Sequence, residues 1–209
     1  MKEDFCRSVA AYATAEIIEK KSRFIGEIFP VASEEEATEQ IAAVKKKYHD
    51  ARHHCFAFVC GMRAELLRFS DDGEPQGTAG KPILAVLTGA ELTNTLIVVT
   101  RYFGGTLLGT GGLTRAYTEA AQAALQAAQI HTHTLGRELT FRVAYGMSGS
   151  VEHYLRKNDI AIGNPVYEND VRYTVFIPLA HADTVVNDLT NICSGNIDIT
   201  SGDPLYRVL

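Results

Sequence analysis

The residues that most suggest chemistry form a glycine-rich turn between an apolar run and an alanine-rich segment. Five glycines fall within nine residues, namely Gly104, Gly105, Gly109, Gly111 and Gly112. Beta-branched residues precede them and apolar residues at helical spacing follow, which predicts a strand, a turn and a helix from about Thr110. The first turn of such a helix leaves backbone N–H groups unpaired, and glycines let a ligand approach them. We therefore predict an anion site here, with positive charge from Arg101, Arg115 and Lys81.

Known nucleotide-binding motifs fit this turn only in part. Gly104 and Gly109 have the Walker A spacing, but Thr110 occupies the position of the essential lysine. Gly109 and Gly111 begin a dinucleotide fingerprint, which Thr114 then breaks. The anion site is therefore generic, and the alternative is a tight turn that packs a helix on a sheet while its arginines pair with carboxylates.

A second group of candidates consists of Asp71, Asp72 and Glu74 around Gly73, in the polar loop of residues 70–80. Carboxylates this close together could hold Mg²⁺ or act as acid and base. Two structural alternatives stay open: the carboxylates cap neighbouring N–H groups, or they pair with Arg101 or Lys81. The loop lacks the spacing of an EF-hand.

The remaining reactive residues give no catalytic set. Cys6, Cys55, Cys60 and Cys193 form no C-x-x-C pair, so we expect reduced structural thiols without disulfides. Cys55 and Cys60 should point to opposite faces of a strand, because five positions separate them. No nucleophile or metal-ligand set stands out, so we assign no catalytic residue, no metal and no cofactor. We expect a bound Mg²⁺ only under the alternative that the protein is an enzyme.

Composition limits the function classes. A chain of 209 residues permits one large domain or two small ones, and its net charge of −5 argues against non-specific nucleic-acid binding. No apolar run approaches the roughly 20 residues that span a bilayer. The polar N-terminus lacks the apolar core of a signal peptide. We therefore expect a cytoplasmic protein with no membrane partner.

The first part of the chain alternates strands and helices. Strands are predicted at residues 14–20, 22–31, 53–60 and 65–69, before the glycine-rich turn. The S-x-x-E sequence from Ser33 to Glu36 is typical of a capping box that opens a helix. A short helix at residues 83–87 should have Pro82 at its first position.

The last part of the chain predicts a second domain. Residues 130–138 look like a polar linker. Strands are then predicted at 139–145, 160–166, 171–179 and 197–200, with helical stripes around Val151 and Leu189. This order of strand, helix, strand, strand, helix and strand is the ferredoxin-like pattern, with both helices on one face of an antiparallel sheet.

Four blocks of sequence resemble the IMPACT/YigZ family in its bacterial two-domain form. They are residues 20–25, 50–55, 70–82 and 98–109, and the resemblance extends over essentially the whole chain. The resemblance implies an α+β protein. Its residues 1–133 would form a domain like ribosomal protein S5 domain 2. Its residues 134–209 would form a ferredoxin-like domain that resembles domain V of elongation factor G.

The resemblance also carries an expectation about function. Eukaryotic relatives regulate translation as binding proteins that compete for the activator of a starvation-responsive kinase, a pathway that bacteria lack. We therefore expect a translation-associated regulatory protein that binds RNA, the ribosome or a translation protein, without evident catalysis. The open sheet face of the second domain is a candidate surface for RNA. Tyr173 and Phe176 lie on one of its strands but on opposite faces, so at most one is exposed, and a buried Tyr173 would belong to the core. The alternative is an enzyme acting on a nucleotide or phosphorylated small molecule at the glycine-rich loop. The oligomeric state is left open.

Overall fold

The computed structural model describes residues 5–208, which form two compact units. The N-terminal unit comprises Cys6–Thr132, and the C-terminal unit comprises residues 133–208 together with Phe5. Both units combine helices with antiparallel sheet, so the predicted α+β class is confirmed. Within the described residues, no helix is long and apolar enough to cross a membrane.

The N-terminal unit is built on a five-stranded antiparallel sheet in the order β2-β3-β6-β4-β5. Its central strand is the predicted apolar run, β6, whose first seven residues are all buried. The strands are β2 (Ala13–Glu19), β3 (Ser22–Pro30), β4 (His53–Cys60), β5 (Leu66–Ser70) and β6 (Thr95–Tyr102). Because β6 is paired on both sides and covered on both faces, it reads as a continuous hydrophobic run.

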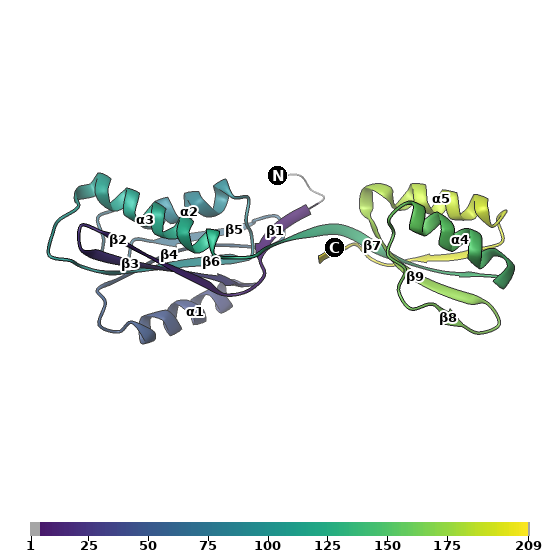
Figure 1. The fold of residues 1–209 in the computed structure, drawn as a ribbon, viewed down its shortest axis with the longest axis horizontal. Coiled ribbons are helices and arrows are strands. Elements are labelled where there is room, and N and C mark those ends of the chain that lie inside the picture. Colours follow the sequence, from purple (N-terminus) through teal and green to yellow (C-terminus); the bar gives the residue numbers. More distant parts are fainter. Residues whose placement is uncertain (1–4, 209) are drawn as a thin grey trace. The chain divides into compact units, whose positions relative to one another are not determined.

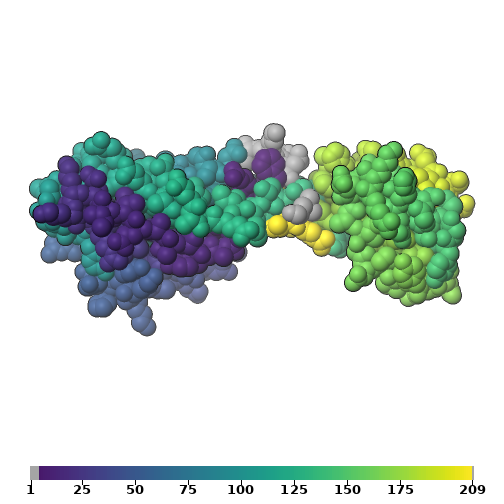
Figure 2. Space-filling view, in the orientation of Figure 1, coloured from purple at the N-terminus to yellow at the C-terminus, as the bar shows by residue number. Residues whose placement is uncertain are grey.

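Helices cover both faces of this sheet (Figure 1). Helices α2 (Gly80–Gly89) and α3 (Gly109–Gln126) pack on one face, and α1 (Glu34–Lys47) packs on the other. Figure 2 shows the same arrangement as a surface, with β2 and β3 in purple between the teal α3 and the blue α1. These layers accord with the S5-domain-2-like fold that the resemblance implies.

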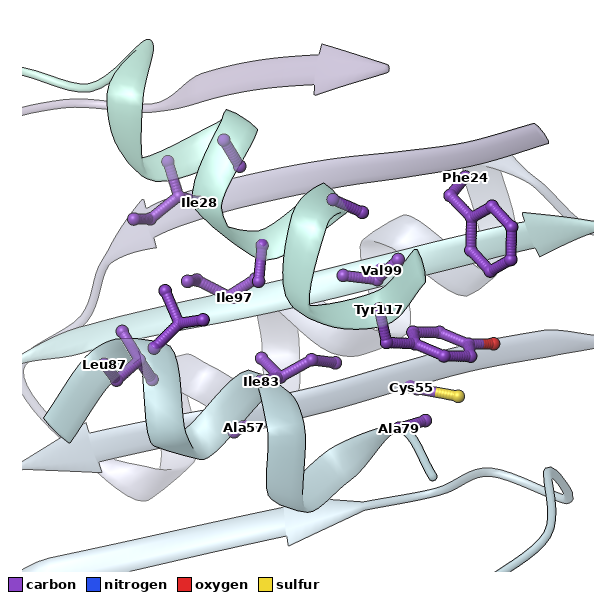
Figure 3. Close-up of a cluster of buried hydrophobic side chains, with 14 of the residues drawn as sticks. Phe24, Ile28, Cys55, Ala57, Ala79, Ile83, Leu87, Ile97, Val99 and Tyr117 are labelled. Carbon is purple, nitrogen blue, oxygen red and sulfur yellow. The ribbon is translucent and has the colours of Figure 1, made fainter. Parts of the chain in front are cut away.

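Each face has its own hydrophobic core. The core under α2 and α3 includes Cys55 beside Tyr117, with Phe24 near the start of β3 (Figure 3). The core under α1 includes Cys60, so the prediction that Cys55 and Cys60 face opposite sides is confirmed. All four cysteines of the chain are buried and free of disulfides.

Two helix starts test the capping predictions. The Ser33 hydroxyl accepts a hydrogen bond from Glu36 N, and Glu36 accepts one from Ala32 N, so the predicted cap of α1 forms. The prediction for Pro82 is wrong, because α2 begins at Gly80 and Pro82 is its third residue. The Asp71 carboxylate accepts the N–H groups of Ala79 and Gly80, which starts the helix two residues earlier.

The predicted linker at residues 130–138 is wrong, because Ile130–Val143 forms one continuous strand, β7. Its partners are β1 (Phe5–Val9), β9 (Val171–Pro178), β10 (Asp198–Ser201) and β11 (Leu205–Val208). Pairing with β11 at residues 133–136 and with β9 from residue 136 onward holds this polar segment extended, although its side chains show no hydrophobic alternation. Strands β1 and β11 were not predicted.

The C-terminal unit has the sheet order β10-β7-β9-β8, with β8 at Val166–Tyr167. Helices α4 (Tyr145–Lys157) and α5 (Ala182–Ile192) lie on one face (Figure 1), and a 3₁₀ turn at Leu179–His181 precedes α5. This order, antiparallel throughout, is the ferredoxin-like arrangement and confirms the prediction.

Two local predictions in this unit are wrong. Of the strand predicted at 160–166, only Val166 pairs, because Ile160 and Ile162 pack on the core without joining the sheet. Tyr145 is the first residue of α4 and not the end of a strand.

Tyr173 is fully buried and donates a hydrogen bond to Glu152, so it belongs to the core and not to the open face of the sheet.

Candidate functional site

A buried ion pair lies at the end of the central strand. Arg101 Nη1 on β6 donates to Glu74 Oε1 over 2.6 Å, and the Tyr117 hydroxyl on α3 donates to the same oxygen over 2.8 Å. Burial, together with neighbouring Cys55 and Glu74, raises the pKa of Tyr117, so the phenol remains a donor. The predicted pairing of a loop carboxylate with Arg101 is thus confirmed for Glu74.

The other two loop carboxylates are also occupied. Asp71 accepts the N–H groups of Gly77, Ala79 and Gly80. Asp72 accepts the His54 N–H and the Lys45 ammonium group. Burial opposes ionisation of both carboxylates, yet these hydrogen bonds outweigh it and lower the pKa of each. The capping interpretation therefore describes Asp71, whereas Asp72 pairs with Lys45 and not with the predicted Arg101 or Lys81.

The described residues of this loop form no metal-binding group of side chains. Within residues 5–208, no group of three or more His, Cys, Asp or Glu side chains is placed to hold a metal ion. Since Asp71, Asp72 and Glu74 each face donors from the protein, they tie the loop to α2, β4 and β6.

The glycine-rich turn divides into a packed residue and open residues. Gly104 N donates to the Ser22 hydroxyl, and a Cβ on Gly104 would lie 2.0 Å from the carbonyl carbon of Lys21. Gly104 therefore lets the turn pack against the β2–β3 connection. By contrast, a Cβ on Gly105, Gly109 or Gly111 would meet no described atom within 4 Å.

The start of α3 carries no cap from the described residues. Leu108 is the N-cap residue, no side chain bonds to the first-turn amides, and no acidic residue lies in that turn. These are the properties expected of the anion site, which stays a prediction for Gly109, Gly111 and Gly112.

A solvent-open cavity of about 600 Å³, here called the hollow, lies beside Arg101. It is lined by Asp50, Ala51, Arg52, His53, Arg101, Tyr102, Phe103 and Leu107. Of the predicted anion residues Arg101 lines the hollow, whereas Lys81 and Arg115 are exposed on α2 and α3 outside its lining. The five glycines of the turn are not among the lining residues either.

Residues 50–53 were not predicted to belong to a site with Arg101. The pairing of β4 with β6 places His53 directly opposite Arg101, across 48 positions of sequence. His53 Nδ1 lies 2.9 Å from the carbonyl oxygen of Asp72. Asp50 accepts a hydrogen bond from the Tyr102 hydroxyl over 2.7 Å. The register of the two strands was the missing signal.

Two large apolar side chains at the hollow face solvent. Leu107 is 84% exposed and Phe103 is 54% exposed. Phe103 also lies against the Arg101 guanidinium, with 5.6 Å between the guanidinium carbon and the ring centre. The hollow thus combines arginine groups with an apolar rim.

Comparisons with known proteins identify the family. A family model described as the Impact N-terminal domain matches residues 20–125, and a domain of unknown function (DUF1949) matches residues 141–196. The IMPACT family member YvyE of Bacillus subtilis is 36% identical over 191 residues, covering 91% of this chain and 88% of that protein. This chain belongs to the IMPACT family.

Further relatives agree with this assignment. The IMPACT family member YigZ of Escherichia coli is 38% identical and covers 86% of this chain and 89% of its own. A solved structure described as that of a hypothetical protein is 35% identical, with a TM-score of 0.60 and coverage of 96% of this chain and 98% of that one. The resemblance seen in the sequence is therefore confirmed over both units.

Proposed function

We propose that this IMPACT family protein is a translation-associated regulatory protein that docks a protein of the translation apparatus at the rim of the hollow. Family membership supports a role related to translation in general. The lining of the hollow offers the exposed apolar side chains of Phe103 and Leu107 together with Arg52.

The exposure of Leu107 and Phe103 next to Arg52 carries this proposal. Adjacent exposed apolar residues mark interaction surfaces, and aromatic and arginine side chains contribute most of the binding energy at such surfaces. The protein gains nothing for its own core from an exposed Leu107. A complex in which a partner covers this side chain would be stabilised by the burial of its apolar surface.

A protein partner fits the charge better than RNA does. The chain carries a net charge of −5, which opposes non-specific contact with phosphate backbones. A docking role also fits the loop carboxylates better than phosphoryl transfer does. Asp71 and Asp72 would have to hold a metal for that chemistry, but both are occupied by donors from the protein.

Ribosome co-sedimentation at low and high salt tests the proposal, with Leu107→Ala and Phe103→Ala as variants. We expect the wild type to co-migrate at both salt concentrations and each variant to bind several-fold less. Leu67→Ala is the matched control, because Leu67 is 40% exposed on β5 and does not line the hollow.

Two results would count against the proposal. Absence of co-migration at both salt concentrations would remove the ribosome as the site of docking. Suppose that co-migration disappears in high salt and that Leu107→Ala co-migrates as the wild type does. This result would indicate contact with RNA through charged groups elsewhere.

A further inference from the structure

The guanidinium of Arg101 has donors that the protein does not use. A guanidinium carries five N–H donors, and Glu74 takes one of them through Nη1. Nε is sealed from solvent and has no hydrogen-bond partner within the described chain. Buried polar groups without partners are rare and costly, so this arginine is only partly satisfied at the wall of the hollow.

His53 presents an acceptor beside these donors. Its Nδ1 faces the carbonyl oxygen of Asp72, which can only accept a hydrogen bond. Nδ1 therefore carries the proton in the neutral ring, and Nε2 is left as the acceptor. Because His53 pairs with Arg101 across β4 and β6, donors and acceptor belong to neighbouring strands at one wall.

One cation at the hollow, Arg52, makes no ion pair with a described residue. Glu74 neutralises Arg101 from the buried side. A hydrogen bond from the Tyr102 hydroxyl lowers the pKa of Asp50, so this carboxylate keeps its negative charge at the edge of the hollow. Arg52 is exposed and makes no ion pair with any described residue.

The size and rings of the hollow suit a small molecule. Its volume of about 600 Å³ lies within the range of small-ligand sites. The rings of Tyr102 and Phe103 line it together with the aliphatic Leu107. A flat group on a ligand would find aromatic surface next to the arginines.

We propose that the hollow binds a small organic oxyanion that carries a flat ring, such as an aryl phosphate or an aryl carboxylate. The oxyanion pairs with Arg52 and takes Nη donors of Arg101 that Glu74 leaves unused, His53 Nε2 accepts a hydrogen bond from a ligand O–H or N–H, and the ring packs against Phe103. The inference goes beyond docking, because it requires no macromolecular partner and places the anion in the hollow and not at the start of α3.

Isothermal titration of the full chain with phenyl phosphate, benzoate and benzyl alcohol tests this site. We expect both oxyanions to bind and the neutral alcohol not to bind, and the stronger of the two anions reports which oxyanion the site prefers. Arg52→Ala should weaken binding about tenfold, the size of one charge-assisted contact. Phe103→Ala should weaken it by a smaller factor.

Arg115→Ala is the matched control, because Arg115 is an exposed arginine on α3 outside the hollow. It should bind phenyl phosphate as the wild type does. The inference is overturned if neither oxyanion binds at millimolar concentration. It is also overturned if Arg115→Ala abolishes binding while Arg52→Ala retains it, since the anion would then lie at the start of α3. Ribosome co-sedimentation needs no oxyanion, so failure here leaves the docking proposal standing.

Discussion

Two loops of the N-terminal unit are equally rich in residues that could do chemistry, but they differ in what those residues face. In the acidic loop, Asp71, Asp72 and Glu74 each meet donors from the protein. In the glycine-rich turn and the adjoining hollow, Phe103 and Leu107 face solvent, and Arg52 makes no ion pair with a described residue. The acidic loop therefore holds the fold together, and the turn offers surface to other molecules.

The largest effect should come from Glu74→Ala. The substitution leaves the buried Arg101 charge unpaired and removes the acceptor of Tyr117, which should cost about 3–5 kcal/mol of unfolding free energy. Urea unfolding measures it. The double variant with Glu74→Leu and Arg101→Leu should be more stable than Glu74→Ala, because it removes both charges. A loss below about 1 kcal/mol in Glu74→Ala would contradict a structural role for the pair.

Asp71→Ala should have the next largest effect. It removes the acceptor for three backbone N–H groups around the start of α2, which should cost about 2–3 kcal/mol. Asp203→Ala is the control, because Asp203 is exposed. Equal stability of the two variants in urea would show that the acidic loop does not hold α2.

Glycine substitutions sharpen the contrast within the turn. Gly104→Ala should cost about 2 kcal/mol, because the new methyl group would overlap the backbone of Lys21. Gly111→Ala should be neutral or stabilising by about 0.5 kcal/mol, because it adds a better helix former where no described atom lies within 4 Å. Thermal unfolding of both variants separates packed from open glycine, and equal losses would contradict the division.

Acid should weaken the acidic loop through Asp71. The pKa of Asp71 is lowered in the folded state, so its contribution is present above the unfolded value of about 4 and is lost as the pH falls through the folded pKa. Urea unfolding at pH 6 and pH 3 should show a smaller difference in Asp71→Asn than in the wild type. An unchanged difference would mean that Asp71 contributes no linked protonation.

Many helices and strands could be predicted from the sequence, because the patterns that indicate them involve only neighbouring residues. The apolar run of β6, the capping residues of α1 and the alternation of β9 each depend on neighbours within a few positions. β7 was missed at its polar start because its extended form depends on distant strands, including β11 at the other end of the chain. The strand predicted at 160–166 failed for the converse reason, since apolar residues there pack without pairing.

The candidate site was only partly predictable for the same reason. The sequence indicates that Arg101 can pair with a carboxylate of the loop. Which of the three carboxylates forms the ion pair depends on how the loop packs against β6. Arg52 and His53 join the hollow through the register of β4 against β6, which no local pattern encodes. Exposure of Leu107 likewise depends on a turn held by Gly104.

The most direct test is a backbone amide NMR titration of the protein with phenyl phosphate. The account predicts the largest shift changes at residues 50–53 and 101–107, around the hollow, with smaller changes at residues 72–74, which contact His53 and Arg101. Changes confined to the acidic loop, or to residues 109–115 at the start of α3, would contradict the claim that the hollow is the binding surface of this unit.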